Sequence, residues 1–280
     1  MSSVYPVQII KINQKGKQEK ADLVAAEEPL EIRIGYGRSD DRQQSKLTVI
    51  MRTPGDDFSL ALGFLYTEGI IASPDQIMSV RYCSDLGNST SKNVVRVEIS
   101  PEVEVDWETI KRNFFSSSGC GVCGKESMES IYVQIADKLD KSKFRVKPDL
   151  MASLSLKFLE NQQIFEYTGG LHAAALFDLE GNLLIIREDV GRHNAIDKVI
   201  GTAFMNGLVP LNEHILMMSS RASFEIVQKT VKAGISLLAV ISAPSSMAVK
   251  LAKEYDLTLL GFVRNGGFNI YSGDFRLDIQ

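Results

Sequence analysis

Residues His214 to Arg264 read HILMMSSRASFEIVQKTVKAGISLLAVISAPSSMAVKLAKEYDLTLLGFVR, and they alternate short apolar runs with amphipathic segments. The runs HILMMSS, SLLAVIS and TLLGFVR are typical of buried strands. The segments between them, FEIVQKTVKA and SMAVKLAKEY, have the apolar spacing of helices. Alternation of this kind builds an α/β layer with right-handed crossovers. We therefore expect an α/β fold for this part of the chain.

The residues before this stretch extend the same layer. A hairpin is predicted for HAAALFDLEGNLLIIRED, which turns at Glu180, Gly181 and Asn182. A helix is predicted for HNAIDKVIGTAF, which follows it. The second half of the chain thus consists of a hairpin followed by alternating helices and strands.

The first half has a different pattern, typical of an α+β domain. Strands are predicted for EIRIGYG, KLTVIMR and VVRVEI. A helix is predicted within TPGDDFSLALGFLYTEGII, where Asp56 and Asp57 occupy the first turn and Gly69 is the stop signal. The charged segment from Asp140 to Pro148 is the best candidate for a linker. We therefore predict an N-terminal α+β domain over residues 1–145 and a C-terminal α/β domain over residues 146–280.

Composition argues against several classes of protein. The net charge of -4 gives no reason to expect nucleic-acid binding. No apolar run reaches the roughly 18 to 20 residues of a membrane span, and the N-terminus lacks the apolar stretch of a signal peptide. The 3 cysteines are too few for a disulfide framework in a chain of 280 residues. We therefore expect a cytoplasmic protein.

The loop SSSGCGVCGKES, from Ser116 to Ser127, holds two of the cysteines. Cys120 and Cys123 form a CxxC pair, and the glycines around them keep bulky side chains away from both sulfurs. Helical spacing follows the loop, so the helix dipole and Lys125 favour the reactive thiolate. In a reducing compartment such a pair is more often catalytic or metal-binding than structural. Cys83 is most simply a packing residue.

Four polar clusters lie where the predicted strands of the second half meet loops. They are YTGGLHAAA with His172, REDVGRHNAIDK, SSRAS and GFVRNGGFNIY. Ligands of open α/β sheets bind at the carboxyl ends of the strands, where we expect three of the four clusters to lie. The second cluster brings together Asp189, Arg192, His193, Asn194 and Asp197. The simpler alternative is that Asp189 or Asn194 caps a helix and that His193 is a solvated side chain.

Six of these motifs, in this order, resemble the FdhD family, the sulfur carrier proteins needed to make active formate dehydrogenase. They are MRTPGDDFSLALGFLYTEGII, SGCGVCG, TGGLHAAALF, EDVGRHNAIDK, SSRASFEIVQK and GFVRNGGFNIY. The resemblance covers the chain from about Pro29 to Tyr271. A CxxC pair alone is weak evidence, whereas this combination is specific.

The resemblance implies a sulfurtransferase with a persulfide intermediate. Such proteins accept sulfur from an L-cysteine desulfurase and pass it to the molybdenum cofactor, in its bis-molybdopterin guanine dinucleotide form, before the cofactor enters the catalytic subunit of formate dehydrogenase. Cys120 matches the persulfide position of the family, and Cys123 would assist transfer or resolve the persulfide. The family motif assigns cofactor contacts to Phe262, Val263, Arg264, Asn265, Gly266 and Gly267. Physically, Arg264 could neutralise a phosphate, and the glycines let backbone amides approach closely.

The resemblance also implies that the C-terminal part is similar to the three-layer cytidine deaminase fold without its zinc site. A zinc deaminase needs H-x-E followed by P-C-x-x-C, whereas here Ala173 and Ala174 follow His172 and the CxxC pair precedes it. A structural zinc site needs four ligands, and the sequence has no second CxxC and no paired histidines at ligand spacing. We therefore expect no structural metal. The alternatives for the CxxC pair are thiol redox chemistry and zinc binding.

Oligomeric state is open at this level. Apolar helices such as Leu60 to Leu65 leave room for a homodimer.

Overall fold

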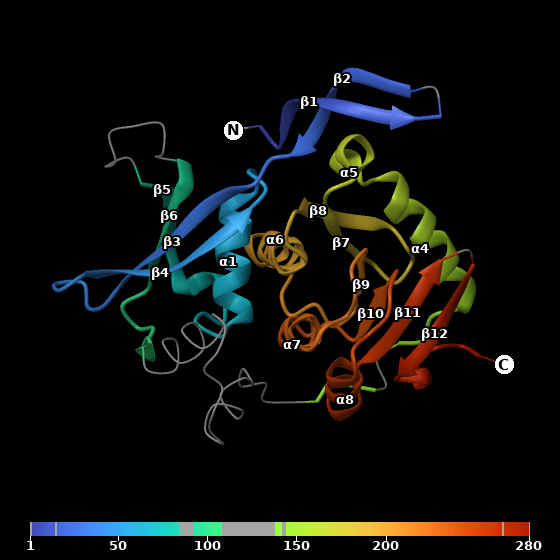
Figure 1. Ribbon diagram of the computed structural model, residues 1–280. Helices are drawn as coiled ribbons and strands as arrows, with labels where there is room; N and C mark the ends of the chain where they lie inside the picture. The colour runs from blue at the N-terminus through green and yellow to red at the C-terminus, as the bar shows by residue number, and fades with distance from the viewer. Residues whose placement is uncertain are drawn as a thin grey trace.

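The computed structural model describes residues 2–14, 16–83, 92–107, 138–141, 144–264 and 266–279. Two β-sheets with helices between and outside them form the body, and an N-terminal hairpin extends from it (Figure 1). The predicted α/β class is therefore confirmed. No helix in the described part of the chain is long and apolar enough to cross a membrane.

The larger sheet has six strands and lies in the second half of the chain. In spatial order these are β12 (Gly267–Ser272), β11 (Thr258–Arg264), β10 (Leu237–Val240), β9 (Ile215–Met218), β7 (His172–Phe177) and β8 (Leu183–Asp189). β9, β10 and β11 are parallel to one another, and β7 and β12 run antiparallel to their neighbours. The connecting helices are α6 (Arg192–Met205), α7 (Phe224–Lys232) and α8 (Ser246–Glu254). The predicted hairpin, strands and helices of this half are all present, with ends shifted by at most two residues.

Both faces of this sheet are covered at its centre, which explains why β9 and β10 are apolar throughout. Leu238 and Val240 of β10 pack in the same core as α6, α7 and α8, whereas Leu237 and Ala239 pack in a second core with α4 (Pro148–Glu160). α4 was not predicted, although it begins with a proline at its first turn and buries Met151, Leu154 and Phe158 at helical spacing. α5 (Gln163–Thr168) follows it directly.

The smaller sheet has four strands and lies in the first half of the chain. Its spatial order is β4 (Gln43–Arg52), β3 (Glu28–Tyr36), β6 (Val94–Ile99) and β5 (Ile77–Tyr82), and a single turn of 3-10 helix, η1 (Pro74–Gln76), precedes β5. The helix predicted after Pro54 is α1 (Asp57–Thr67). It packs on the buried face of this sheet, so that Leu60 and Leu65 share a core with Ile32.

α1 and α6 cross closely between the two sheets (Figure 1). A Cβ atom at Gly63 would overlap the carbonyl oxygen of Asp197, and one at Gly201 would overlap that of Ser59. The hydroxyl groups of Thr202 and Ser59 form a hydrogen bond of 3.1 Å across the same crossing. One hydrophobic core therefore runs from the small sheet through both helices to the large sheet. The expectation that Leu60 to Leu65 leave room for a homodimer was wrong, because these residues are buried inside the chain.

The segment predicted as a linker is packed in its described part. Phe144 and Val146 are buried, and Val146 pairs with Leu277 in an isolated parallel bridge. Residues 142 and 143 lie outside the described residues. The domain division at 145/146 stays a prediction.

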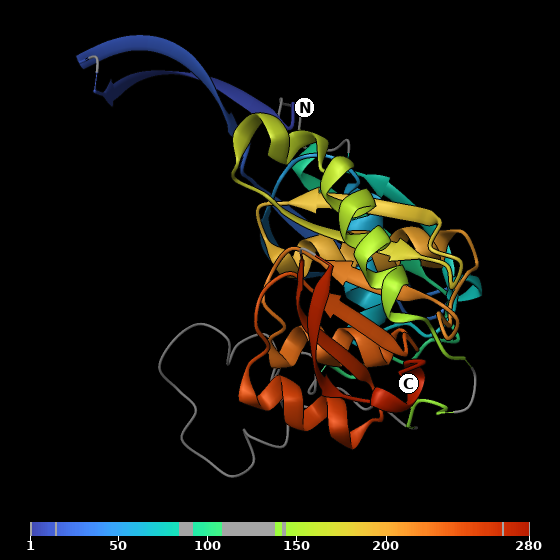
Figure 2. The same cartoon turned by 90° about the vertical axis from the view of Figure 1, so that its right-hand side faces the viewer.

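The N-terminal hairpin consists of β1 (Val4–Asn13) and β2 (Gly16–Ala25), and within the described part of the chain these two strands pair with each other alone (Figure 2). We call residues 4–25 the arm. Ser3 attaches its base to the body, because the Ser3 carbonyl accepts from Ala26 N and Ser3 Oγ donates to Pro54 O.

Candidate functional site

The four predicted polar clusters meet at one edge of the six-stranded sheet. β8, β9, β10 and β11 all end there, because β8 and β9 are both antiparallel to β7 and therefore run the same way. β7 and β12 run in the opposite direction and begin at this edge. We call the side chains gathered there the sheet-edge cluster, which comprises His172, Arg192, His193, Arg221, Ser223, Phe262 and Arg264. The prediction that three of the four clusters lie at the carboxyl ends of strands is confirmed, and the fourth, with His172, lies at the start of β7.

The first turns of α6 and α7 are joined at this edge by His193. Its Nε2 atom lies 2.7 Å from Glu225 Oε2 and 3.5 Å from Ser223 Oγ. The hydrogen bond with His193 lowers the pKa of Glu225, so this carboxylate is charged at neutral pH. His193 is therefore held by an acceptor rather than freely solvated.

His172 lies beside these residues at the start of β7. Burial lowers its pKa, and the nearby Arg192 and His193 lower it further. At neutral pH His172 is therefore a neutral imidazole, which can accept as well as donate a hydrogen bond.

The N-terminus of α6 differs from those of the next two helices. Ser223 and Ser245 cap α7 and α8 through their side chains, whereas the cap of α6 is Gly191, which has no side chain to do so. The first turn of α6 contains no acidic residue and begins with Arg192 and His193. Cations at a helix N-terminus are unfavourable unless an anion is bound there. Arg192 Nε is buried and, among the described residues, has no hydrogen-bond partner. This end of α6 is therefore suited to a negatively charged group.

The segment at the end of β11 adds a third arginine. The guanidinium of Arg264 lies 5.9 Å from the ring centroid of Phe262, which has a positive φ of 56° and donates its backbone N–H to Ser242 O. A Cβ atom at Gly266 or Gly267 would meet nothing within 4 Å, so the backbone is open on that side. Val263 points into the core instead, and Asn265 lies outside the described residues.

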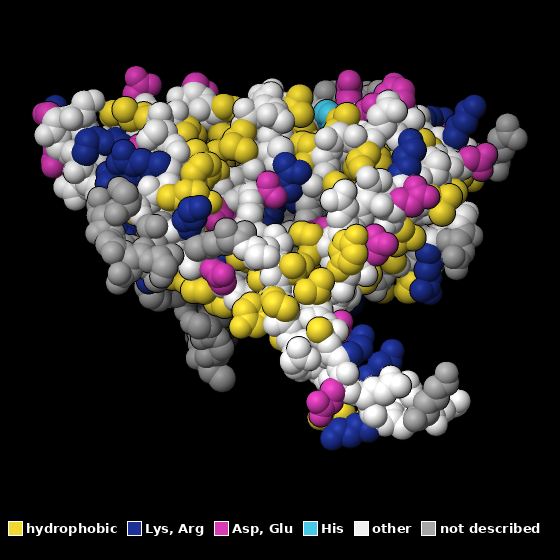
Figure 3. All heavy atoms as spheres, turned by 90° about the horizontal axis from the view of Figure 1, so that it is seen from above, with side chains coloured by type: hydrophobic (Ala, Val, Ile, Leu, Met, Phe, Trp, Pro, Cys, Tyr) yellow, Lys and Arg dark blue, Asp and Glu magenta, His cyan; other side chains and the backbone are white. Residues whose placement is uncertain are grey.

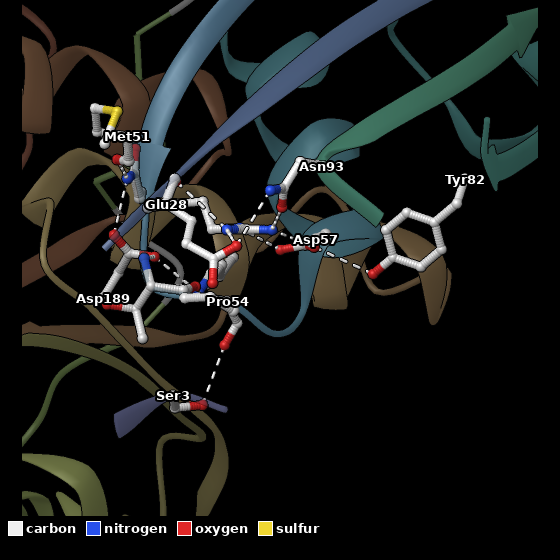
Figure 4. Close-up of polar contacts among 12 residues, drawn as sticks. Ser3, Glu28, Met51, Pro54, Asp57, Tyr82, Asn93 and Asp189 are labelled. Carbon is white, nitrogen blue, oxygen red and sulfur yellow. Dashed lines mark hydrogen bonds and ion pairs between the residues drawn. The ribbon is translucent and has the colours of Figure 1, made fainter. Parts of the chain in front are cut away.

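A polar network fixes the sheet edge to the loop before α1. Thr53 N donates to Asp189 Oδ2 at 3.1 Å, and Lys198 Nζ lies 2.8 Å from the same carboxylate oxygen and donates to Thr53 O. Asn194 Nδ2 donates to Asp189 Oδ1 and to Met51 O, both at 2.8 Å. Asp189 Oδ1 also accepts a hydrogen bond from Gly191 N, so each carboxylate oxygen of Asp189 has two partners. Figure 4 shows Asp189 and Met51 in this network, which we call the junction network.

The junction network continues into the small sheet. Arg52 is fully buried and forms two hydrogen bonds with the carboxylate of Asp57, at 2.8 and 3.0 Å. Tyr82 donates its hydroxyl to Asp57, and Arg52 also donates to Asn93 (Figure 4). Burial and the adjacent Asp57 raise the pKa of Tyr82 to about 12, so it stays a donor. Gly55, with φ of 114°, lets the chain turn between Thr53 and α1.

A cavity of about 240 Å³ borders the junction network. It is lined by the loop of Thr53 to Asp56, the end of β8 and the start of α5. Its charged groups are already paired, because Arg187 lies 3.3 Å from Asp56 and Glu188 accepts from the backbone N–H groups of Ile164 and Phe165. No group of metal-ligating side chains is present among the described residues.

The sequence and fold were compared with those of known proteins. A profile of the FdhD/NarQ family matches residues 25–278. The chain belongs to the FdhD/NarQ family. It is 44% identical over 275 residues to the sulfur carrier protein FdhD of Streptomyces avermitilis, which covers 97% of this chain and 95% of that one. It is 42% identical to those of Sulfurisphaera tokodaii, over 97% and 98% of the two chains, and Mycobacterium tuberculosis, over 92% of each.

The fold is also similar to a solved structure. A structure from Desulfotalea psychrophila, described as that of a formate dehydrogenase accessory protein, has a TM-score of 0.74 and 22% sequence identity. It covers 99% of this chain and 100% of the other. At this identity the likeness shows that the FdhD/NarQ chain shares its fold.

The predicted site residues divide into three groups in this FdhD/NarQ structure. His172, Arg192 and His193 lie together at the sheet edge, and Arg264 lies at the end of β11 on the same edge. Cys120 and Cys123 lie outside the described residues. Cys83 is buried, which confirms it as a packing residue. Asp197 does not join the cluster: it lies on the core side of α6, where Lys229 Nζ is 3.0 Å from its carboxylate. Residues four apart lie on the same face of a helix, so spacing alone would place Asp197 with His193. Asp197 lies one turn further into α6, where its carboxylate accepts hydrogen bonds from Thr67 and Lys229 in the core between the helices.

Sequence reasoning missed Thr53 and the structural role of Asp189. Asp189 was a candidate ligand group, but its oxygens are used within the junction network. The alternative that it caps α6 is close to what is observed, because it accepts from Gly191 N. In the sequence, Thr53 is marked only by its place in the family motif that begins at Met51.

Proposed function

We propose that this FdhD/NarQ protein carries sulfur from an L-cysteine desulfurase to the molybdenum cofactor for formate dehydrogenase, in the cytoplasm. Relatives that match nearly the whole chain are named sulfur carrier proteins, and the structural neighbour is described as a formate dehydrogenase accessory protein. The arginines of the sheet-edge cluster support binding of an anionic molecule as the acceptor of the sulfur. Thiol redox chemistry and zinc binding have no such support.

In the proposed first step, the Cys120 thiolate attacks the outer sulfur of a persulfide on the desulfurase. A new S–S bond forms on Cys120, and the desulfurase cysteine leaves as its thiolate. Cys123 is placed in sequence to assist the transfer or to resolve the persulfide. The product is a sulfurtransferase intermediate that holds one sulfur for delivery.

The proposed acceptor is the bis-molybdopterin guanine dinucleotide form of the cofactor, bound as substrate at the sheet edge. This molecule carries pyrophosphates, which need cations or backbone N–H donors. Arg264 and the open backbone at Gly266 and Gly267 would hold one phosphate group. Arg192 and the uncapped start of α6 provide a second position with the same chemistry. Phe262 and Asn265 complete the segment that the family motif assigns to the cofactor.

We further propose that the six-stranded sheet with α6, α7 and α8 is a cytidine deaminase-like module that has lost its chemistry. The order of its strands and the hairpin at its start are compatible with this. His172 is followed by buried Ala173 and Ala174, so no glutamate is present at the position of the general acid/base. The edge of the sheet is then free to bind a nucleotide without deaminating it.

The direct test is mass spectrometry after incubation with a desulfurase and L-cysteine. Wild type is expected to gain the mass of one sulfur on the peptide that contains Cys120, and Cys120→Ala to gain none. Cys83→Ser is the matched control and is expected to load normally, since Cys83 is buried. Full loading of Cys120→Ala would remove that residue as the carrier.

A further inference from the structure

The small sheet has one face packed on α1 and one face open to solvent. Ile32 lies on the buried face, so its neighbour Arg33 lies on the open one. Arg33 is paired with Lys46 on one side and with Arg96 on the other, and Arg81 is paired with Arg96 in turn. In the described part of the chain no helix packs on this face (Figure 1). Four cations therefore stand in a row across β4, β3, β6 and β5.

Glu98 gathers one half of these cations above the sheet. Its carboxylate lies 2.9 Å from the guanidinium of Arg42 and 3.9 Å from that of Arg81, and it also pairs with Arg96. Gly35 leaves room for this arrangement, because a Cβ atom there would overlap the Glu98 carboxylate. One negative charge thus fixes three positive charges, and Arg96 Nε is buried without a hydrogen-bond partner among the described residues.

Glu31 fixes the other half of the row. Its carboxylate accepts a hydrogen bond from Arg33 Nε at 2.5 Å and lies 3.6 Å from Lys46 Nζ. Five cations therefore share two carboxylates, which leaves a local charge of +3 on a chain whose net charge is -4. Figure 3 shows a group of Lys and Arg side chains on the left part of the body, where the small sheet lies. We call the five cations the basic face: Arg33, Arg42, Lys46, Arg81 and Arg96.

The chemistry of the basic face fits a protein surface that presents carboxylates. Like charges directly opposite one another destabilise a sheet, so an anion bound over the row would relieve a cost to folding. Arginines that are already held in place lose little entropy on binding, and each can take a carboxylate through two hydrogen bonds. Val49 and Met51 extend the same face on β4 and are 46% and 49% exposed, and arginine with methionine is typical of protein interfaces.

A nucleic acid fits this face less well. Single-stranded nucleic acids are bound by grooves that combine cations with aromatic rings for base stacking. The described residues of the open face include no aromatic side chain. The negative charge of the whole chain also repels a long polyanion.

The basic face belongs to the sheet from which the chain enters the segment of Cys120. Trp107 is the last described residue before residues 108–137. Its ring packs on that of Tyr36, with the centroids 4.9 Å apart. Tyr36 ends β3, the strand that carries Arg33. A protein docked on the small sheet is therefore close to the start of the cysteine-containing segment.

On the basis of the function proposed above, we propose that the basic face docks a carboxylate-rich surface of the L-cysteine desulfurase that loads Cys120. Opposite charges on the two proteins speed their encounter and set their orientation. The proposed acceptor site lies at the edge of the other sheet, so the sulfur donor and the cofactor have separate places on the molecule.

The test is the rate of sulfur loading on Cys120 at increasing concentrations of the carrier, which gives KM and kcat separately. Lys46→Glu combined with Arg81→Glu is expected to raise KM at least ~10-fold and to leave kcat within about two-fold, as expected when docking alone is weakened. Their side chains are 58% and 61% exposed, so the fold is expected to persist. The matched control is Arg145→Glu combined with Lys147→Glu, which makes the same change of net charge at exposed residues before α4. The control is expected to keep the wild-type KM.

Two further measurements separate docking from loss of fold. Lys46→Arg combined with Arg81→Lys preserves both charges and is expected to preserve KM. Raising the salt from about 0.05 to 0.3 M is expected to raise KM for wild type but to change it little for the Lys46→Glu/Arg81→Glu variant, because salt screens the attraction. Urea unfolding checks that each variant is folded.

An unchanged KM in the Lys46→Glu/Arg81→Glu variant, or an equal rise in the Arg145→Glu/Lys147→Glu control, would overturn this docking surface and leave the proposed function standing. A wild type that accepts no sulfur would contradict the proposed function and the docking surface together. Binding of a single-stranded RNA oligonucleotide that is lost in the Lys46→Glu/Arg81→Glu variant while KM is unchanged would assign the basic face to nucleic acid instead.

Discussion

At the scale of single residues, the structure separates exposed charged groups at the sheet edge from buried charged groups that hold the fold. Asp189 and Lys198 are both buried and use their polar atoms on each other and on Thr53. Arg264 and Arg221 are exposed at the same sheet edge. Charged residues of the family motifs therefore have different surroundings, and each can be tested by a substitution that leaves the others in place.

Asp189→Asn is expected to lower the free energy of unfolding by on the order of 3 kcal/mol. The change keeps the shape but leaves the ammonium of Lys198 buried without its counter-charge, which is more costly than losing an exposed pair. Urea unfolding measures the loss. Glu31→Gln is the control, because Glu31 pairs with Arg33 nearer the surface, and a change below about 1 kcal/mol is expected there. Equal effects in the two variants would contradict this account.

The lowered pKa of His172 predicts a specific pH dependence. The unfolded chain takes up a proton at this histidine near its ordinary value of 6.5, whereas the folded chain does so only at lower pH. His172 therefore reduces stability as pH falls below 6.5, and its contribution is fully favourable above that value. His172→Gln should make the decline between pH 7.5 and 5.5 shallower in urea unfolding. Parallel curves for the two proteins would show that His172 is not responsible.

At the scale of elements, the contact between α1 and α6 decides how the two halves of the chain meet. Both helices present a glycine to the backbone of the other, Gly63 and Gly201. Such close approach is open only to residues without a Cβ atom. The contact also explains why α1 is buried on nearly all sides. The apolar sequence of α1 would alone fit a contact with another chain equally well.

Gly63→Ala is expected to destabilise the protein by about 2 kcal/mol or more, although alanine favours helices over glycine by up to about 1 kcal/mol. The added methyl group overlaps the carbonyl oxygen of Asp197, which is backbone and cannot rotate away. Thermal and urea unfolding measure the change. Gly267→Ala is the control, because a methyl group there meets open space. A Gly63→Ala variant as stable as wild type would mean that the helices can separate at little cost.

At the scale of the whole molecule, the sheet-edge cluster and the cysteine loop belong to different parts of the chain. The cluster is built on strands and helices from residue 172 onward, and its junction with the first half passes through Thr53. We therefore expect that a substitution in the sheet-edge cluster can weaken binding of the proposed cofactor acceptor without changing the loading of sulfur on Cys120.

Arg264→Ala is expected to weaken binding of GDP, used as a fragment of the cofactor, by roughly 10- to 100-fold. The change removes a charge-assisted contact worth about 1.5 to 3 kcal/mol. Calorimetric titration measures the affinity, and sulfur loading on Cys120 should survive. Arg81→Ala is the control, since Arg81 is exposed on β5 in the other sheet. Equal GDP affinity for wild type and Arg264→Ala would move the acceptor site away from this segment.

The sequence by itself determined the kinds of element in the second half, because strand and helix periodicity are local properties of a few consecutive residues. TLLGFVR is β11 residue for residue, and VVRVEI is β6 in the first half. It also placed the polar clusters at strand ends, since topology follows from the alternation of helices and strands. α4 was missed although its apolar spacing carries the same kind of signal.

Only the tertiary structure decided which surfaces of these elements meet. Thr53 and Asp189 are 136 residues apart in sequence, and nothing local to either predicts their hydrogen bond. The same holds for Asp197, because helical spacing alone could not assign it to the site or to the core. It also holds for Leu60 to Leu65, because their apolar pattern fits an oligomer contact as well as burial within the chain. Periodicity specifies that one face of an element is apolar. Which other element packs on that face depends on complementary shape, such as the close approach that Gly63 and Gly201 permit because they lack a Cβ atom. Complementary shape of this kind exists only once the chain is folded.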